Sequence, residues 1–177
     1  MINYKKISAK SSHLAYFHNL YLANFPECER REWSSVIRLM STDARFHVTI
    51  ADHDGLDVGF ISYWTLDGFN YIEHLAVEGR WRRMGYGASL VRHVASLGAP
   101  LLLEVEPPVD DVTVNRVKFY QRLGLTLRED VEYVQPSYGP GMPPDPLRLM
   151  TSSSMTHDDV ERAVATIKAV VYRQATQ

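Results

Sequence analysis

Three apolar segments joined by two tight-turn signals constrain the fold of this chain more than any other feature. The segments span residues 46–52, 57–66 and 69–77, and the pairs Asp54-Gly55 and Asp67-Gly68 stand between them. Because Asp-Gly pairs favour the backbone twist of a β-hairpin, these segments predict an antiparallel meander of three strands.

A strand–helix–strand unit follows the meander. An apolar helical stripe over residues 90–97 ends just before Pro100, and residues 101–105 form a short strand of the kind that is buried on both faces. A crossover of this type is right-handed. It therefore places the strands over 69–77 and 101–106 side by side and parallel.

Further elements are predicted on both sides of this unit. They are a strand over 2–7, helices over 14–25 and 33–40, a helix over 112–123, a strand over 126–134, a proline-rich loop over 136–146, a strand over 147–150 and a helix whose stripe spans 160–171. The order predicts an α+β fold: a mixed, mostly antiparallel sheet with one parallel strand pair and helices on both faces. We expect one domain over 1–151 and a helical extension over 152–177, packed on the same domain or on a partner subunit.

The composition excludes several classes of protein. Hydrophobic residues make up 45% of the 177 residues and the formal net charge is −2, which is typical of globular proteins and argues against a nucleic-acid partner. The longest apolar runs are far shorter than the roughly 18 residues that span a bilayer, and the first residues lack a secretory signal. We expect a cytoplasmic protein with no membrane partner. Cys28 is the only cysteine and the histidines lack ligand spacing, so no metal is predicted.

The turn between the strand over 69–77 and the next helix has the composition of an anion-binding loop. Gly85 and Gly87 allow tight turning and close approach of a ligand, and three arginines add positive charge. The amides of residues 83–88 lie at a helix start, where the helix dipole favours negative charge. Together these features suit a diphosphate.

Two known phosphate loops can be compared with this turn. It is not a P-loop, because Gly87 is followed by Ala88-Ser89 rather than by Lys-Ser/Thr. It lacks the third glycine of a Rossmann fingerprint, although Glu104 or Glu106 lies at the distance of a ribose-binding acid. A dinucleotide-binding redox enzyme therefore remains an alternative.

The segment Arg82-Arg83-Met84-Gly85-Tyr86-Gly87 resembles the Arg/Gln-x-x-Gly-x-Gly/Ala signature of the GCN5-related N-acetyltransferase (GNAT) superfamily. The strand before it, and the segment Phe119 to Leu125 with its aromatic-Tyr-x-x-x-Gly pattern, stand where the family has them. Leu125 replaces the usual Phe, and the similarity extends over residues 1–151. The resemblance implies the acyl-CoA N-acyltransferase fold and transfer of an acetyl group from acetyl-CoA to a primary amine by direct attack on the thioester.

The resemblance also implies which residues hold acetyl-CoA. Its diphosphate would bind the amides of the signature, and its pantetheine arm would pair with the edge of the preceding strand. The implied residues are Leu75, Ala76, Val77, Arg82, Arg83, Met84, Gly85, Tyr86, Gly87 and Ala88. Many relatives carry a cofactor-contacting Asn at the position of Thr113, and here Asn115 lies two residues later, so Asn115 is a candidate contact.

The chemistry needs a base for the acceptor ammonium and an acid for the departing thiolate. Tyr120 is the candidate acid, because the phenol has an ordinary pKa of about 10, close to that of a thiol. Glu73 and Glu104 are the candidate bases, with Glu106 and a water relay as alternatives. A carboxylate inside a largely apolar strand is costly unless it is paired or wet, which favours a place in a cleft.

The acceptor pocket is predicted from residues rich in aromatic and amide groups. In the family the hairpin that contains Tyr133, Gln135 and Tyr138 borders the acceptor, and Trp33 or Tyr63 would complete the pocket. The acceptor is a small-molecule or peptide amine. A non-catalytic acyl-CoA-binding module of the same fold is a further alternative, and a homodimer is expected if the stripe over 160–171 exceeds what one chain buries.

Overall fold

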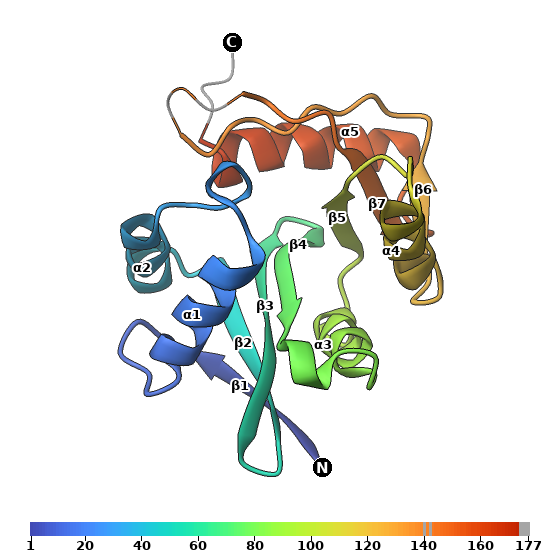
Figure 1. Cartoon of the computed structure of the whole chain (residues 1–177). Helices are drawn as coiled ribbons and strands as arrows, with labels where there is room; N and C mark the ends of the chain where they lie inside the picture. Colours follow the sequence, from blue (N-terminus) through green and yellow to red (C-terminus); the bar gives the residue numbers. More distant parts are fainter. Residues whose placement is uncertain (140, 142, 174–177) are drawn as a thin grey trace. The chain divides into compact units, whose positions relative to one another are not determined.

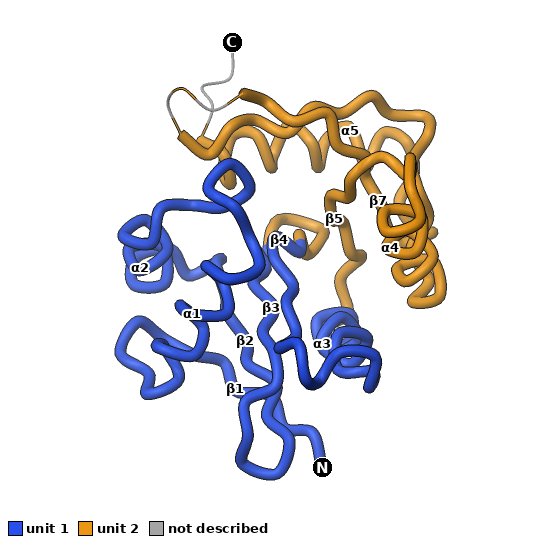
Figure 2. Tube along the Cα trace, viewed as in Figure 1, with its two compact units in different colours: residues 1–65, 72–97 blue, residues 66–71, 98–177 orange. Residues whose placement is uncertain are grey.

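The computed structural model describes residues 1–139, 141 and 143–173, so Pro140, Met142 and residues 174–177 lie outside the described part. The chain forms two compact units, which Figure 2 colours separately. Unit 1 comprises residues 1–65 and 72–97, and unit 2 comprises residues 66–71 and 98–177. The predicted extension from residue 152 belongs to unit 2.

Unit 1 contains the predicted meander, as the first half of the chain in Figure 1 shows. Its elements are β1 (Ile2–Ile7), α1 (Leu14–Asn24), η1 (Glu27–Glu29), α2 (Trp33–Thr42), β2 (Phe46–His53), β3 (Leu56–Leu66), β4 (Phe69–Val77), η2 (Gly79–Trp81) and α3 (Tyr86–Ala95). Residues 66–71, which are the last residue of β3, the turn and the first three residues of β4, belong to unit 2. β2 pairs antiparallel with both β1 and β3. Asp54 and Gly55 have φ of 51° and 88°, the left-handed conformation that an Asp-Gly turn requires.

The core of unit 1 lies on both faces of β3. Every residue from Val58 to Trp64 is buried, which requires cover on both sides of the strand. Figure 1 shows α1 and α2 to one side of these strands and α3 to the other. The helices present apolar stripes that include Phe17 and Val36 from one side and Leu90 from the other, all buried.

Unit 2 contains the remaining strands, the crossover partner of β4 and the C-terminal helix. Its elements are β5 (Leu101–Val105), α4 (Asp111–Gln121), β6 (Leu125–Arg128), β7 (Arg148–Ser152), α5 (His157–Thr166) and the π-helical turn η3 (Ile167–Val171). β7 pairs antiparallel with both β5 and β6, and the start of β4 meets β5, where the amide of Asn70 donates to the carbonyl of Pro100 at 2.8 Å. The seven-strand order is β1-β2-β3-β4-β5-β7-β6 with one parallel pair, which confirms the predicted mixed sheet.

The sixth strand is shorter than the sequence predicts. A strand was expected over 126–134, but β6 ends at Arg128. Beyond it Val131 and Tyr133 are buried by side-chain packing rather than by strand pairing, so their apolar character gave a false strand signal. Tyr133 therefore lies outside the hydrogen-bonded strands of the sheet.

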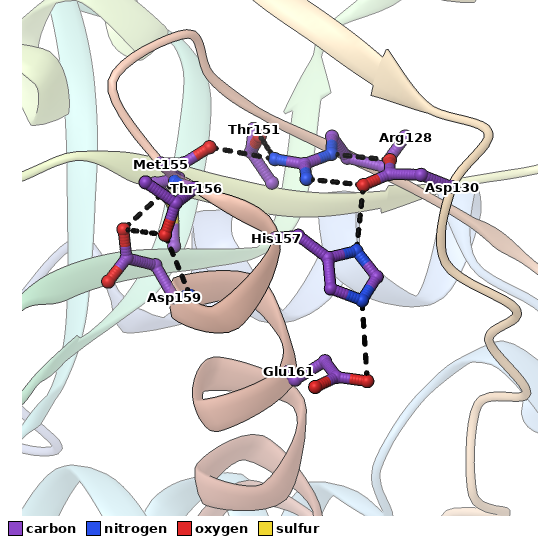
Figure 3. Close-up of polar contacts among 8 residues, drawn as sticks. All are labelled: Arg128, Asp130, Thr151, Met155, Thr156, His157, Asp159 and Glu161. Carbon is purple, nitrogen blue, oxygen red and sulfur yellow. Dashed lines mark hydrogen bonds and ion pairs between the residues drawn. The ribbon is translucent and has the colours of Figure 1, made fainter.

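A polar network joins the end of β6 to the start of α5 (Figure 3). Arg128 donates to the Asp130 carboxylate at 2.6 Å and to the carbonyl of Met155 at 2.8 Å, and Nδ1 of His157 lies 2.9 Å from the same carboxylate. The hydrogen bond to Asp130 raises the pKa of His157. Thr156 caps α5 together with Asp159 in a capping box.

The apolar stripe of the C-terminal helix is buried in the single chain. Val160, Ala163, Ile167 and Val171 are all buried, so this stripe does not by itself call for a partner subunit. The helix closes with a wider turn, in which the amide of Tyr172 donates to the carbonyl of Ile167 at 3.1 Å. Within the described residues, no helix is both long enough and apolar enough to cross a membrane.

Candidate active site

The segment that links β4 to α3, together with the first three residues of α3, is called here the signature loop and spans residues 78–88. It begins with η2, passes through Arg83 at φ 65° and Gly85 at φ 86°, and enters α3 at Tyr86. Two left-handed residues separated by one position turn the chain tightly just before α3, and a turn of this kind can gather successive amides into an anion-binding nest. Gly85 is the N-cap of α3 and has no side chain that could accept a hydrogen bond. The amides of the first turn of α3 therefore donate to no side chain of the cap residue.

Arginine side chains fix the signature loop and add positive charge to it. Nη2 of Arg82 donates to Oδ1 of Asn24 at 2.7 Å and its Nε donates to the carbonyl of Val77 at 3.2 Å. Arg80 pairs with Glu78 at 2.8 Å, which neutralises its charge locally. Arg83 and Met84 are exposed on the same loop. The loop therefore combines backbone donors at a helix start with guanidinium groups, which is a combination that suits a diphosphate.

The strand that leads into the loop has one buried and one more open face. Ala76 is buried, whereas Leu75 and Val77 alternate with it on the less buried face, where a ligand can reach the strand. Gly59 of β3 sits against this strand, because a Cβ there would lie 2.7 Å from the carbonyl oxygen of Ala76. The missing side chain lets β3 approach the last residues of β4 closely.

Glu73 lies on β4 in unit 1 as a buried, paired anion. Its carboxylate is 1% exposed; Oε1 accepts from Nε of Arg31 at 2.9 Å and Oε2 accepts from Nε1 of Trp64 at 2.7 Å. The Arg31 guanidinium also lies over the Trp64 ring. Both donors favour the ionised carboxylate. This arrangement suits an anchor of α2 to the sheet better than a group that takes up protons.

Glu104 lies on β5 in unit 2 among phenols. The Tyr133 hydroxyl donates to its Oε1, and the Tyr172 hydroxyl donates to its Oε2 at 3.0 Å. The Tyr172 hydroxyl also lies 3.1 Å from that of Tyr71. We call Tyr71, Glu104, Tyr133 and Tyr172 the Glu104 cluster. Burial, with the nearby Glu104 charge, raises the pKa of both Tyr133 and Tyr172, so both phenols stay protonated and act as donors.

Tyr120 lies near the end of α4 in unit 2. Its side chain is nearly buried, and this burial raises its pKa to about 12. The phenol is therefore protonated at neutral pH, which is the state that an acid needs. Thr113 completes the N-terminal cap of α4 with Asp110, whereas Asn115 is exposed. The capping role explains a polar residue at 113 without any ligand.

The remaining predicted residues are placed as follows. Gln135 is buried and pairs through its backbone with Asp145, and the Tyr138 ring packs against the Tyr172 ring at 5.2 Å. Glu106 is partly exposed and pairs with Arg116. In unit 1, Trp33 packs on the rings of Phe17, His18 and Tyr21, and Tyr63 stacks near His47.

The structure thus brings Glu104, Tyr133 and Tyr138 together in unit 2 and places Glu73 with Trp33 in unit 1. Sequence reasoning missed Tyr172. The signal that could have found it is its position directly after Val171, the last apolar residue of the C-terminal stripe. It also missed Arg31, for which the sequence carries no local signal. Among the described residues, no group of three or more histidines, cysteines or acids could hold a metal ion.

Comparison with known proteins agrees with this geometry. Residues 44–125 match the family described as an acetyltransferase (GNAT) domain. A solved structure of a GNAT-family protein from Bacteroides thetaiotaomicron is 32% identical, with a TM-score of 0.91, over 98% of this chain and 99% of that chain. A search of curated proteins gives no match.

Two more distant structures share the fold. One is Arabidopsis thaliana Naa50 in complex with the bisubstrate analogue CoA-Ac-MVNAL, at 18% identity and a TM-score of 0.60 over 85% of this chain and 98% of that chain. The other is the ribosomal-protein-S18-alanine N-acetyltransferase of Escherichia coli, at 17% identity and a TM-score of 0.59 over 90% and 98% of the two chains. From the identity and coverage of the Bacteroides protein, the chain belongs to the GNAT family of acetyltransferases.

Proposed function

We propose that the protein transfers the acetyl group of acetyl-CoA to a primary amine by direct attack of the amine on the thioester. The observation that carries this proposal is the signature loop: left-handed Arg83 and Gly85 precede the uncapped first turn of α3. A backbone nest of this kind, with guanidinium groups beside it, fits a diphosphate better than it fits a neutral ligand. Acetyl-CoA carries both that diphosphate and the reactive acyl group.

Binding of acetyl-CoA is assigned to the signature loop and to β4. The amides from Arg82 to Ala88 would hold the diphosphate, and the open face of β4 at Leu75 and Val77 would pair with the pantetheine arm. Arg83 is exposed and would meet the phosphates directly, whereas Arg82 is tied to Asn24 and shapes the loop. Asn115 is an exposed contact candidate on α4.

We assign the base to Glu104 and the acid to Tyr120. The acceptor ammonium gives a proton to the Glu104 carboxylate, and the amine nitrogen then bonds to the acetyl carbonyl carbon. As the carbon–sulfur bond breaks, the departing thiolate takes the proton of the Tyr120 phenol, and the nitrogen loses its second proton, which restores the phenol as the amide forms. Glu73 is not chosen, because its side chain is 1% exposed and the charged Arg31 guanidinium pairs with it and opposes proton uptake. The groups that donate to Glu104, in contrast, are neutral phenols. Orientation of the two substrates supplies much of the rate.

The acceptor is assigned only by class. Tyr133 donates to Glu104, and Tyr138 packs on Tyr172, which is the second donor, so an amine near this carboxylate would meet aromatic rings. Gln135 lies between these two tyrosines, Tyr133 and Tyr138, in the chain and would supply an amide group. An ammonium group is attracted both by a carboxylate and by the faces of aromatic rings. Of the two distant structures named above, one is in complex with the bisubstrate analogue CoA-Ac-MVNAL and the other is a ribosomal-protein-S18-alanine N-acetyltransferase. A small-molecule or peptide amine therefore fits best.

The loop assignment is tested by isothermal titration of CoA, acetyl-CoA and NAD into the wild type and Gly87→Glu. A carboxylate in the first turn of α3 repels phosphate, so CoA binding should be lost while the melting temperature stays close to that of the wild type. Ala95→Glu adds the same charge to the last turn of the same helix and is the matched control, which should bind normally. Undiminished binding to Gly87→Glu refutes the loop assignment.

Acetyl transfer itself is tested by thiol release from acetyl-CoA across a panel of primary amines and amino-terminal peptides. Turnover that depends on the amine supports the enzyme. Tight CoA binding with no turnover on any amine identifies an acyl-CoA-binding module instead, and preference for NAD over CoA identifies a dinucleotide site.

A further inference from the structure

The C-terminal turn brings a phenol to the Glu104 carboxylate. Tyr172 follows η3, and its hydroxyl donates to Oε2 of Glu104 at 3.0 Å, while Tyr133 donates to the other oxygen. We propose that Tyr172 is a positioning residue for acetyl transfer, which holds the Glu104 carboxylate in one orientation and in its ionised form. This inference rests on the proposed function, in which Glu104 receives the proton of the acceptor.

The direction of the hydrogen bonds follows from the chemistry of the groups. An ionised carboxylate can only accept, so both phenols must donate to it. The Tyr172 hydroxyl has one hydrogen, which goes to Glu104, and its oxygen then accepts from the Tyr71 hydroxyl at 3.1 Å. The result is a directed chain from Tyr71 through Tyr172 to Glu104. Each donor in such a chain strengthens the next.

The surroundings keep these phenols neutral. Tyr71 and Tyr133 are buried, and Tyr138 packs its ring against that of Tyr172. Lys168, one turn before Tyr172, places its Nζ 5.9 Å from the centre of the Tyr133 ring. The titratable groups named around Glu104 are therefore four phenols and one ammonium group. Of these, Tyr133 and Tyr172 favour an anionic carboxylate by donating to it directly.

Tyr172 comes from a segment outside the part of the chain that matches the acetyltransferase domain. Residues 44–125 match the acetyltransferase domain, and Tyr172 lies well beyond them. Burial of Val160, Ala163, Ile167 and Val171 docks α5 and η3, and the docked segment ends at the phenol. The C-terminal helix thus acts as a support for the base rather than as an appendage.

Loss of the Tyr172 hydroxyl has a defined consequence for proton transfer. A base must be ionised when the acceptor ammonium arrives, and the proton then leaves the nitrogen for the carboxylate oxygen. With one donor removed, the neutral carboxyl becomes more favourable, and a smaller fraction of the protein holds the ionised form at a given acidic pH. The effect appears in the titration of Glu104 itself.

The first measurement is the titration of the Glu104 side-chain carbon by 13C NMR, with the signal assigned from its absence in Glu104→Gln. Wild type, Tyr172→Phe and Tyr16→Phe are compared. Tyr16 is a matched control, because its hydroxyl is buried and has no hydrogen-bond partner among the described residues, so its loss removes an oxygen but no described hydrogen bond. We expect the Glu104 midpoint to rise by about one pH unit in Tyr172→Phe and to stay in place in Tyr16→Phe.

The second measurement is kcat/KM for the best amine as a function of pH. The acidic limb should move in the same direction as the NMR midpoint in Tyr172→Phe, with CoA affinity unchanged. Equal NMR midpoints in wild type and Tyr172→Phe overturn the inference, and so does a shifted midpoint with an unmoved acidic limb. The NMR titration needs no acceptor: a shifted midpoint in a protein that acetylates no amine supports the positioning of Glu104 and refutes the proposed function separately.

Discussion

The buried pair of Arg31 and Glu73 gives a prediction whose size can be worked from the structure. The two side chains are 12% and 1% exposed, and Trp64 is the second donor to the carboxylate. An exposed pair of this kind is worth about 0–1 kcal/mol, whereas removal of one partner from a buried pair costs about 3–5 kcal/mol, because the other charge stays buried alone. We expect Arg31→Met to fall in the larger range.

Urea unfolding followed by tryptophan fluorescence measures this cost in unit 1 alone. Trp33, Trp64 and Trp81 are the three tryptophans of the chain, and all lie in that unit. With a slope of about 2 kcal/mol per molar urea, the loss corresponds to a midpoint that is lower by roughly 1.5–2.5 M.

The double variant Arg31→Met/Glu73→Gln is the matched control. It removes the orphaned charge, so it should recover a large part of the loss. A midpoint for Arg31→Met that lies within about 0.5 M of the wild type would show that the pair behaves as an exposed one and would refute the reasoning. A double variant no more stable than Arg31→Met would refute it equally, because the cost would not then come from the unpaired carboxylate.

Three further predictions concern other parts of the chain. Gly59→Ala places a methyl group 2.7 Å from the carbonyl oxygen of Ala76, so unfolding free energy should fall by about 1–3 kcal/mol and CoA affinity should weaken with it; full affinity would show that the strand yields without disturbing the loop. Tyr120→Phe should lower kcat far more than CoA affinity, and because the pKa of Tyr120 is about 12, wild-type activity should show no loss from this group below about pH 10. Asp130 raises the pKa of His157, so protonated His157 stabilises the fold at low pH and this contribution disappears as pH rises through the raised pKa. The melting-temperature advantage of wild type over His157→Gln should therefore be larger near pH 5.5 than near pH 8.5, and an advantage that is equal at both would contradict the assignment.

The order of helices and strands could be predicted from the sequence because its signals are local. Asp54-Gly55 and Asp67-Gly68 fix two hairpins, and apolar periodicity distinguishes the helices from the strands around them. The strand expected over 126–134 is the exception. There, apolar residues are buried by packing and not by pairing, and composition does not distinguish the two causes.

The candidate site was predictable only in part, because its contacts join residues far apart in the sequence. The conformation of the signature loop follows from Gly85 and its neighbours, which lie within one turn. The partners of the two candidate bases do not follow in this way. Arg31 reaches Glu73 across 42 positions and Tyr172 reaches Glu104 across 68, so only the folded chain distinguishes an anchoring carboxylate from one held by phenols.

The π-helical turn over Ile167–Val171 has a consequence for how the end of this chain can vary. An α-helical turn would return the amide of Tyr172 to residue 168, but here it bonds to Ile167, so the turn accommodates one more residue than usual. Deleting a single residue from this turn restores a regular helix and leaves the phenol near its present direction, whereas inserting a residue rotates the phenol by about 100° around the axis, away from its carboxylate. We therefore expect a single deletion in this turn to be tolerated far better than a single insertion.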